Sequence, residues 1–447
     1  MFYQLNAPQR FFSPDLIRFF NDFPKTLDET YERILKGINE AQKDNAHRLL
    51  QCLTVASRPL RVEEIAELLK FDFRASSSGG DPKLENWRWD GHEEAVLSTC
   101  SGLIAIVRSG DSRVIQISNF IVEEYLTSPR IAWSPCVDVS RFHIDLESAH
   151  TIMAQACLAT LLRSDKHDEK GNAKRSPLDK YAAQYWVEHA QFEKVSSRVR
   201  DGMEDLFDNS KPHFSAWLQV HDMDGEAWAT FSMNKEHHGG SPLYYAALCG
   251  FYNLAEPLIM KHPDQVNARG GRILAPLPAA LYKKHLLVAN LLYRNGAVVD
   301  VRDSNKETPL LAATVNGEVE IMRWLLDHGA DANAGNVVSR TPLHYAASLL
   351  YPEVIQVLFE HGVDINSQSV AGETPLYEVS SRANVEGRIV DVVRRLLEHG
   401  ADPNICNILN STPLHEASER GYPEVARLLI SYGAKIHGKD GQGNSSF

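Results

Sequence analysis

Short helical segments with one apolar face recur through the second half of this chain of 447 residues. Between Glu353 and His361, valines and leucines fall at the spacing that places them on one face of a helix. Upstream, Thr341 and Pro342 predict the start of another helix, because threonine caps helix N-termini and proline suits the first turn. Gly362 ends the pair where a left-handed residue is needed. The pattern predicts two short helices followed by an extended finger.

The same unit returns at a nearly constant interval. Its opening, Thr-Pro-Leu or a close variant, starts at residues 241, 275, 308, 341, 374 and 412, so the spacings are 34, 33, 33, 33 and 38 residues. This period and this opening resemble ankyrin repeats, and the resemblance covers residues 241–447. It implies a solenoid that recognises another protein and carries no chemistry of its own. The long last interval places an insertion around residues 382–388, where we expect a longer loop between the two helices of the fifth repeat.

The first half of the chain predicts a different architecture. Helices are expected at 26–35, 44–57 and 62–69, and a hairpin at 103–117. Thr26 and Glu29 form a predicted capping box at the start of the first helix. Residues 74–92 begin with a run of serines and glycines and predict an exposed loop. Three helices followed by a hairpin is the order of a winged-helix domain.

Residues 23–35, which read Phe-Pro-Lys-Thr-Leu-Asp-Glu-Thr-Tyr-Glu-Arg-Ile-Leu, resemble a stretch of fungal NACHT–ankyrin proteins. Those proteins belong to the STAND class of nucleotide-switched NTPases and are similar to NOD-like receptors. Segments 98–104 and 120–126 resemble the winged-helix domain that follows the NTPase, and segments 149–162 and 177–186 resemble the helical linker beyond it. The resemblance implies a mainly α-helical chain with four parts: the tail of an NTPase region at 1–22, a winged-helix-like domain at 23–140, a helical linker at 141–240, and six ankyrin repeats with a truncated seventh at 241–447.

The chemistry that defines the NTPases is missing from the sequence. A P-loop, G-x-x-x-x-G-K-[ST], would hold nucleotide phosphates, and neither this motif nor a Walker B strand occurs. We therefore expect no catalytic residue, no cofactor and no enzymatic activity. Two explanations stay open, a naturally shortened protein or a coding segment lost upstream. At the other end, residues 445–447 stand where the next Thr-Pro-Leu belongs, and no polar capping repeat follows, so we expect the inner face of the last repeat to be exposed.

Charge and cysteine content narrow the partners and the compartment. The sequence holds 46 lysines and arginines against 58 aspartates and glutamates, which argues against nucleic acid or an anionic membrane as partner. The third predicted helix carries three glutamates facing Lys70 and should repel DNA. Six scattered cysteines, the lack of a signal peptide and the lack of an apolar run of about 20 residues favour a cytoplasmic protein. His237-His238 and the acidic segment 222–226 lack a full ligand set, so no metal is expected.

The finger tips offer the sharpest candidate site. Tips usually carry polar turn residues, but here apolar residues stand at Val337, Val338, Val370, Ile408 and Leu409. Stacked fingers would align these residues in one stripe, and together with Arg340 they form the candidate surface for a protein partner. In the alternative interpretation, the same side chains pack against one another between the fingers.

The sequence thus predicts a non-catalytic recognition and scaffold protein, the sensor half of a NACHT–ankyrin signalling protein, with a protein partner and no small-molecule substrate. Two other functions stay open. The chain could be a fragment of a nucleotide-hydrolysing STAND switch whose P-loop lies upstream. It could also be a DNA-binding regulator built on the winged helix, although the acidic third helix argues against that function.

Overall fold

The structure is a computed structural model that describes residues 26–72, 83–84, 100, 102–110, 112–163, 176–223, 239–381, 386–443 and 445. The chain divides into two compact units, Met1–His221 and Asp222–Phe447. Within the described ranges, no helix is both long and apolar enough to cross a membrane. The predictions for 1–22, for His237-His238 and for most of 222–226 concern residues outside these ranges.

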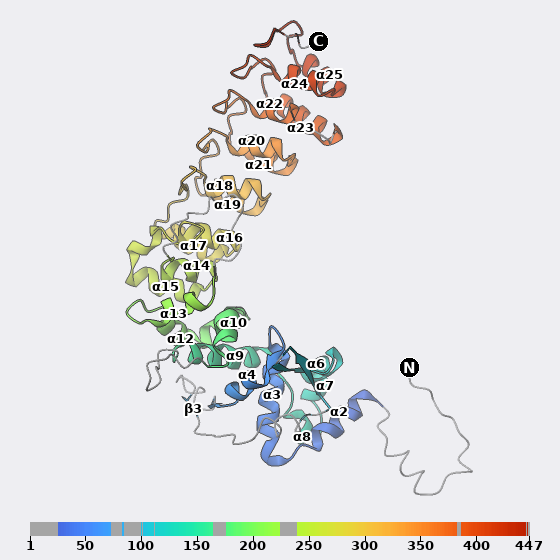
Figure 1. Ribbon diagram of the computed structural model, residues 1–447, viewed down its shortest axis with the longest axis vertical. Coiled ribbons are helices and arrows are strands. Elements are labelled where there is room, and N and C mark those ends of the chain that lie inside the picture. Colours follow the sequence, from blue (N-terminus) through green and yellow to red (C-terminus); the bar gives the residue numbers. More distant parts are fainter. Residues whose placement is uncertain are drawn as a thin grey trace, which may run out of the picture. The chain divides into compact units, whose positions relative to one another are not determined.

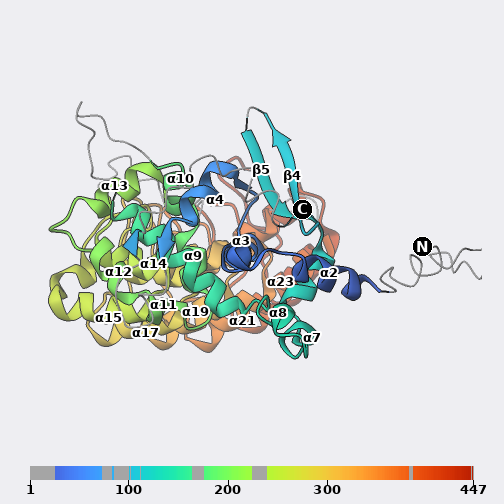
Figure 2. The same cartoon turned by 90° about the horizontal axis from the view of Figure 1, so that it is seen from below.

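The first unit opens with the winged-helix arrangement that the sequence predicts, and Figure 2 shows its hairpin beside the helices. Its elements are α2 (Leu27–Lys36), η1 (Glu40–Gln42), α3 (Lys43–Val55), α4 (Val62–Leu68), β4 (Ile104–Ser109) and β5 (Ser112–Ile117). Helix α2 begins where expected, because the Thr26 hydroxyl accepts a hydrogen bond from the backbone N–H of Glu29 at 3.1 Å. A strand that the sequence analysis missed, β1 (Leu60–Arg61), pairs with β5 and gives the antiparallel order β1–β5–β4.

The sequence analysis expected helix α4 to present three glutamates to solvent, but the structure differs. Glu64 is fully buried, and its carboxylate accepts hydrogen bonds from the guanidinium groups of Arg58 and Arg61 at 2.7–3.0 Å. Burial alone would raise the pKa of Glu64, but these bonds and one from the backbone N–H of Arg61 outweigh it and hold the pKa below its usual value. Of the three glutamates only Glu63 is exposed and Glu67 is half-buried, so the acidic surface is smaller than expected.

Part of the loop expected at 74–92 is a strand. Strands β2 (Phe71–Asp72) and β3 (Lys83–Leu84) form a short antiparallel pair, in which Phe71 faces Leu84 and Asp72 faces Lys83. The other residues of the expected loop lie outside the described ranges.

Helices complete the first unit. They are α6 (Phe120–Thr127), α7 (Pro129–Ala132), α8 (Val137–Ser140), α9 (Leu146–Leu161), α10 (Asp179–Gln191), α11 (Val195–Arg198), α12 (Arg200–Leu206) and α13 (His213–Val220). An aromatic cluster joins three of them, with the rings of Trp186 and Trp217 5.4 Å apart and Phe207 packed on both. The indole N–H of Trp217 donates to the carbonyl of Ala183 at 3.0 Å, which satisfies its polar atom inside this core.

The second unit is the solenoid of paired helices that the repeat predicts, and Figure 1 shows the pairs stacked in sequence order. The pairs are α14 (Pro242–Leu248) with α15 (Tyr252–Lys261), α16 (Pro276–Tyr282) with α17 (Leu286–Arg294), α18 (Pro309–Val315) with α19 (Val319–Asp327), α20 (Pro342–Ser348) with α21 (Pro352–Glu360), α22 (Pro375–Ser380) with α23 (Glu386–Glu398), and α24 (Pro413–Glu419) with α25 (Pro423–Ser431). A 3-10 helix, η3 (Pro263–Asn267), follows the first pair.

Each repeat opens with proline at the first helical position, and in five of the six a serine or threonine precedes it as the N-cap, whereas Ala275 before α16 makes no side-chain cap. At α18 the Thr308 hydroxyl accepts from the backbone N–H of Leu311 at 3.3 Å. At α20 the cap is reciprocal, because His344 Nδ1 accepts from the Thr341 N–H at 3.1 Å. His344 Nε2 lies 3.0 Å from the carbonyl oxygen of Glu373 in the next finger.

Asparagine side chains connect the loops of successive repeats. Asn333 Oδ1 accepts the N–H of Asp364 at 2.7 Å, and Asn366 and Asn404 make the same bond to the loops that follow them, at 2.9 Å each. Asp300 replaces asparagine at one position and accepts the N–H of Asp331 through Oδ2 at 2.9 Å. Its other oxygen, Oδ1, is buried without a hydrogen-bond partner among the described residues.

Two expectations for the array need correction. The insertion of the fifth repeat does not simply lengthen a loop, because Glu386 to Arg388 are helical and α23 has thirteen residues where α19, α21 and α25 have nine. Residues 382–385 lie outside the described ranges. The apolar positions of the last repeat are covered, since Leu414 and Val425 are fully buried and Leu428 is 9% exposed.

Candidate protein-recognition surface

A polar residue at the base of each finger closes the turn that forms its tip. Asn336 Oδ1 accepts the backbone N–H groups of Val338 and Arg340, each at 3.1 Å. Asn407 Oδ1 does the same for Leu409 at 2.9 Å and for the residue two positions further at 3.0 Å. These bonds place Val337 and Val338 at the outermost point of one finger, and Ile408 and Leu409 at the outermost point of another.

The tip turns need a left-handed residue just after these two positions. Ser339 and Asn410 both have φ of 59°, and Gly372 has φ of 75° in the equivalent place. The sequence indicates this left-handed conformation at Gly372 and Asn410, because glycine and asparagine both tolerate it. The three tips therefore share one backbone shape, despite their different side chains.

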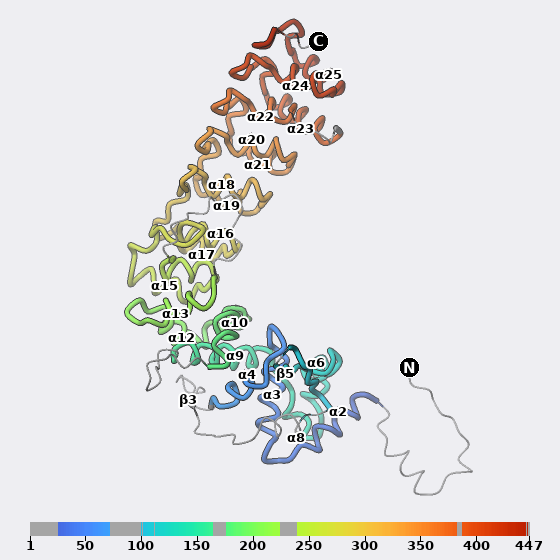
Figure 3. Tube along the Cα trace, in the orientation of Figure 1, coloured from blue at the N-terminus to red at the C-terminus, as the bar shows by residue number. Residues whose placement is uncertain are grey.

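Backbone hydrogen bonds link each tip to the one before it. The N–H of Val370 donates to the carbonyl of Val338 at 2.9 Å, and the N–H of Ile408 donates to the carbonyl of Ala371 at 3.0 Å. At the two ends, Val337 bonds to the preceding finger and Leu409 accepts from the following one. Figure 3 shows the loops between successive helix pairs on one side of the array, and these hydrogen bonds place neighbouring tips next to one another.

The five apolar tip residues are exposed. The exposed fractions are 51% for Val337, 45% for Val338, 65% for Val370, 74% for Ile408 and 64% for Leu409. The contacts between neighbouring tips therefore leave about half or more of each side chain accessible. We call these five residues the tip stripe. Its three tip segments, 337–339, 368–372 and 406–410, contain no charged residue, as is typical of the core of a protein interface.

Arg340, the sixth candidate residue, is held inside the array. Its guanidinium pairs with the carboxylate of Glu378 in the next repeat and lies over the ring of Tyr345, with 4.6 Å between the guanidinium carbon and the ring centroid. The Tyr345 hydroxyl in turn accepts from the side-chain amide of Asn336 at 2.9 Å, and burial raises the pKa of Tyr345. Arg340 therefore supports the finger instead of extending the apolar stripe outward.

Sequence reasoning missed the residues that hold the tips in place. Glu378 and Asn336 anchor one finger, and Asn407 anchors another with its amide, which donates to the Tyr377 hydroxyl at 2.9 Å. Tyr377 donates to the carboxylate of Glu416 at 2.6 Å. An asparagine just before an apolar tip indicates the turn in the sequence. The hydrogen-bond partners in the next repeat can be identified only from the structure.

The described residues contain no group of three or more histidine, cysteine, aspartate or glutamate side chains that could hold a metal ion. None of the six cysteines forms a disulfide, and burial raises the pKa of the Cys52 and Cys100 thiols to about 12. Thiols with such pKa values are not thiolate nucleophiles near neutral pH.

Comparison with protein families agrees with both halves of the fold. Residues 277–369 and 364–440 match the family model of ankyrin repeats, and residues 31–134 match the winged-helix domain of GPI inositol-deacylase. The chain therefore carries ankyrin repeats together with a winged-helix domain of that type. Ankyrin repeats indicate protein–protein interaction, and their fold is typically non-catalytic.

Curated relatives and solved structures extend this comparison. The chain is 31% identical over 300 residues to azaphilone pigments biosynthesis cluster protein L of the fungus Monascus ruber, covering 63% of this chain and 61% of that protein. It is 35% identical over 69 residues to alpha-latrocrustotoxin-Lt1a of Latrodectus tredecimguttatus, covering 15% of this chain and 5% of the toxin. The chain thus spans less than two thirds of the length of either relative. Solved structures include the ankyrin repeat domain of Bcl-3, with 27% identity, TM-score 0.42 and coverage of 46% of this chain and 92% of that one. Another is an ankyrin repeat domain from Acinetobacter baumannii, with 32% identity, TM-score 0.40 and coverage of 43% and 98%.

Proposed function

We propose that this chain is a non-catalytic recognition and scaffold protein that binds a protein partner through the tip stripe. The observation that carries the proposal is a run of five exposed apolar side chains across three successive tips without one charged residue among them. Exposed apolar surface of this kind is favourable to bury, and burying one such side chain contributes roughly 1.5–3 kcal/mol. We expect neither a small-molecule substrate, nor nucleic acid, nor a membrane as partner.

The winged-helix domain supports a more specific role. A winged helix followed by helices and ankyrin repeats is the order of the region beyond the NTPase in NACHT–ankyrin proteins, and we propose that the chain is the sensor half of such a signalling protein. The alternative is a fragment of a nucleotide-hydrolysing switch whose P-loop lies upstream. Transcript mapping upstream of the codon for Met1 separates these two functions. We propose a cytoplasmic location, which the lack of a disulfide among the six cysteines supports.

The test of the tip stripe compares variants that differ only in where an exposed apolar side chain is removed. The stripe variant is Val338→Ser with Leu409→Ser, and the control is Leu287→Ser, which removes a 74% exposed leucine from α17. Each protein serves as bait in a quantitative capture from extract of the source cells, read by mass spectrometry. We expect partners of the unchanged chain to fall at least about tenfold with the stripe variant, in line with the loss of 1.4 kcal/mol or more, and to persist with the control.

Thermal melting of the same proteins separates a contact surface from a structural one. Side chains that are about half exposed contribute little to folding, so we expect the melting temperature of the stripe variant to stay close to that of the unchanged chain. Equal capture by both variants would contradict the proposal. So would a clear fall in melting temperature for the stripe variant alone, because the tips would then pack against one another.

A further inference from the structure

The insertion in the fifth repeat builds an additional helical turn. Helices α19, α21 and α23 end at the same point of their repeats, next to the pairs His328-Gly329, His361-Gly362 and His399-Gly400. The four residues by which α23 exceeds its neighbours therefore lie at its N-terminus and make about one turn. Arg388 stands on this turn, at a height that the shorter helices of the other repeats do not reach.

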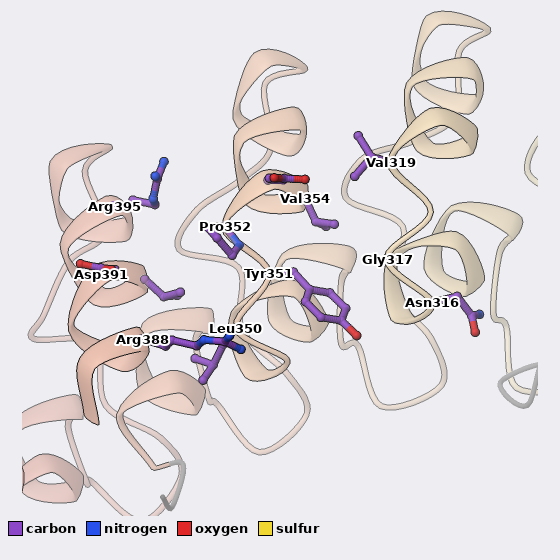
Figure 4. Close-up of a pocket in the computed structure, with 12 residues that line it drawn as sticks. Asn316, Gly317, Val319, Leu350, Tyr351, Pro352, Val354, Arg388, Asp391 and Arg395 are labelled. Atoms are coloured by element: carbon purple, nitrogen blue, oxygen red, sulfur yellow. The ribbon is translucent and has the colours of Figure 1, made fainter. Parts of the chain in front are cut away.

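This additional turn forms one wall of a groove on the array. The groove has a volume of about 620 Å³ and is lined by α23 and by the turns that join the paired helices of the third and fourth repeats. Its floor is apolar, with Val354 buried and Val319, Leu350 and Tyr351 half-buried. Figure 4 shows Arg388 reaching toward Leu350, and Tyr351 pointing toward Gly317. The groove lies at the helix-pair turns and is a separate surface from the tip stripe.

Leu350 occupies a backbone position that favours glycine. Its φ is 57°, in the left-handed region, and the equivalent turns of three other repeats place Gly250, Gly317 and Gly421 there, with φ of 69–74°. A leucine in this conformation is strained relative to glycine, and such strain tends to accompany functional sites. The side chain that this strained residue supplies lies on the floor of the groove.

The cations of the groove are unpaired. Arg388 and Arg395 are two helical turns apart on α23, both are exposed, and neither guanidinium makes an ion pair or hydrogen bond with a described residue. In the third repeat, by contrast, Arg323 pairs with Glu360 at 2.7 Å. Glu353 and Asp391 also line the groove without ion-pair partners among the described residues, so a densely anionic ligand such as nucleic acid would meet carboxylates as well as guanidinium groups.

We propose that this groove is a second recognition site, for a peptide segment in which an apolar side chain stands next to a carboxylate. The apolar side chain would rest on Leu350 and Tyr351, and the carboxylate would accept hydrogen bonds from Arg388 in the two-pronged geometry that guanidinium groups favour. The volume is within the range of ligand sites, which span about 300–1,000 Å³. The site goes beyond the tip stripe and does not depend on it.

The test uses the full chain and two short fluorescein-labelled peptides, one with leucines flanked by glutamates and one with lysines in place of the glutamates. Binding is measured by fluorescence anisotropy. We expect the glutamate peptide to bind at least about tenfold more tightly than the lysine peptide. Arg388→Glu should weaken binding of the glutamate peptide roughly tenfold, because it replaces the attracting charge with a repelling one. The matched control is Arg394→Glu, an exposed arginine of the same helix that does not line the groove.

A third variant separates recognition from folding. Leu350→Gly should leave the melting temperature unchanged or raise it, since glycine accepts the left-handed conformation without strain. The same variant should weaken binding of the glutamate peptide roughly fivefold. Absence of binding, equal affinity for the two peptides, or equal losses for Arg388→Glu and Arg394→Glu would each overturn the proposal. The Val338→Ser and Leu409→Ser variant should bind the peptide normally, so that failure of the tip stripe and failure of the groove are distinguishable.

Discussion

Each unit contains a buried histidine, but the hydrogen-bond partners of the two histidines come from different distances along the chain. In the first unit, His189 Nδ1 lies 3.0 Å from His150 Nδ1, and His189 Nε2 lies 2.9 Å from the Tyr181 hydroxyl, which in turn accepts the N–H of Ser57 at 3.2 Å. These partners come from α9, from α10 and from the segment that follows α3. In the second unit, His344 bonds within its own repeat and to the next finger. The first unit therefore depends on distant segments, whereas the array repeats one local arrangement.

The comparison predicts which of the two units should unfold cooperatively. An array whose contacts join only neighbours is stabilised repeat by repeat, while a core assembled from distant segments is expected to open as a whole. Changes in the first unit should therefore spread through that unit, and changes in the array should stay near the altered repeat.

The largest expected effect follows from the aromatic cluster. Trp217 is 1% exposed, so Trp217→Ala should destabilise the first unit by about 3–5 kcal/mol, the usual cost of removing a large buried side chain. Native-state hydrogen exchange should show lost protection in α9, α10 and α13, with protection retained from α18 to α25. Trp133→Ala is the control, because Trp133 is 83% exposed and its removal should change stability little. Equal loss of protection in α20 and α24 would show that the two units unfold together.

An intermediate effect is expected on acidification. Burial lowers the pKa of His189 to about 3 and that of His344 to about 4, whereas a histidine in an unfolded chain titrates near 6.5. The unfolded chain thus takes up protons that the folded chain resists, so stability is complete above pH 6.5 and falls as the pH decreases. Between pH 6.5 and 5 the loss should reach about 2 kcal/mol for each histidine.

Urea unfolding at pH 7 and pH 5 measures this loss, and hydrogen exchange assigns it to a unit. His189→Gln should flatten the pH dependence of the first unit and His344→Gln that of the array. The exposed His437 provides the control, since His437→Gln should leave both profiles as they are. Profiles that neither buried-site variant alters would refute the assignment.

The smallest expected effect is a gain in stability at Asp300, which takes the place of an asparagine among the residues that connect the loops of successive repeats. Asp300 Oδ1 is buried without a described partner, and burial raises the pKa of this carboxyl. Asparagine could instead donate to the carbonyl of Gly329, as Asn267 donates to that of Gly296 at 2.9 Å. Asp300→Asn should therefore stabilise the array by about 0.5–1.5 kcal/mol at pH 7.

The gain should shrink at low pH. The raised pKa means that the folded array binds the proton of Asp300 more tightly than the unfolded chain does, so Asp300 becomes costlier as the pH rises and the carboxyl ionises. The urea midpoint at pH 7 and pH 4 measures this. The reciprocal change, Asn333→Asp, should destabilise the array at pH 7, and a neutral result for both changes would show that these bonds do not couple the repeats.

Local signals in the sequence predicted much of the fold. Thr341, Pro342 and Gly362 act within their own repeat, so the helix pairs of the array follow from each repeat separately. The sequence left open whether the tip residues are exposed or pack against one another between the fingers, and the structure shows them 45–74% exposed. The function of those residues remains a proposal.

Contacts between distant segments were not predictable from one sequence. Strand β1 exists only because it pairs with β5, more than fifty residues further along. The burial of Glu64 is a local feature that was missed, since its partners Arg58 and Arg61 lie only six and three residues away. Arg340 was grouped with the tip stripe because its partner, Glu378, lies in the next repeat. The insertion was expected as a loop, but part of it continues α23 as an additional helical turn.

The backbone links between the tips have a consequence for the thermodynamics of association. A surface carried on independent loops must be ordered when a partner arrives, and that ordering subtracts from affinity. Here the N–H of Val370 and the N–H of Ile408 already fix each tip to its neighbour, and β-branched side chains have few rotamers to lose. Association at the tip stripe should therefore carry a small conformational-entropy penalty and proceed with the array close to its free shape.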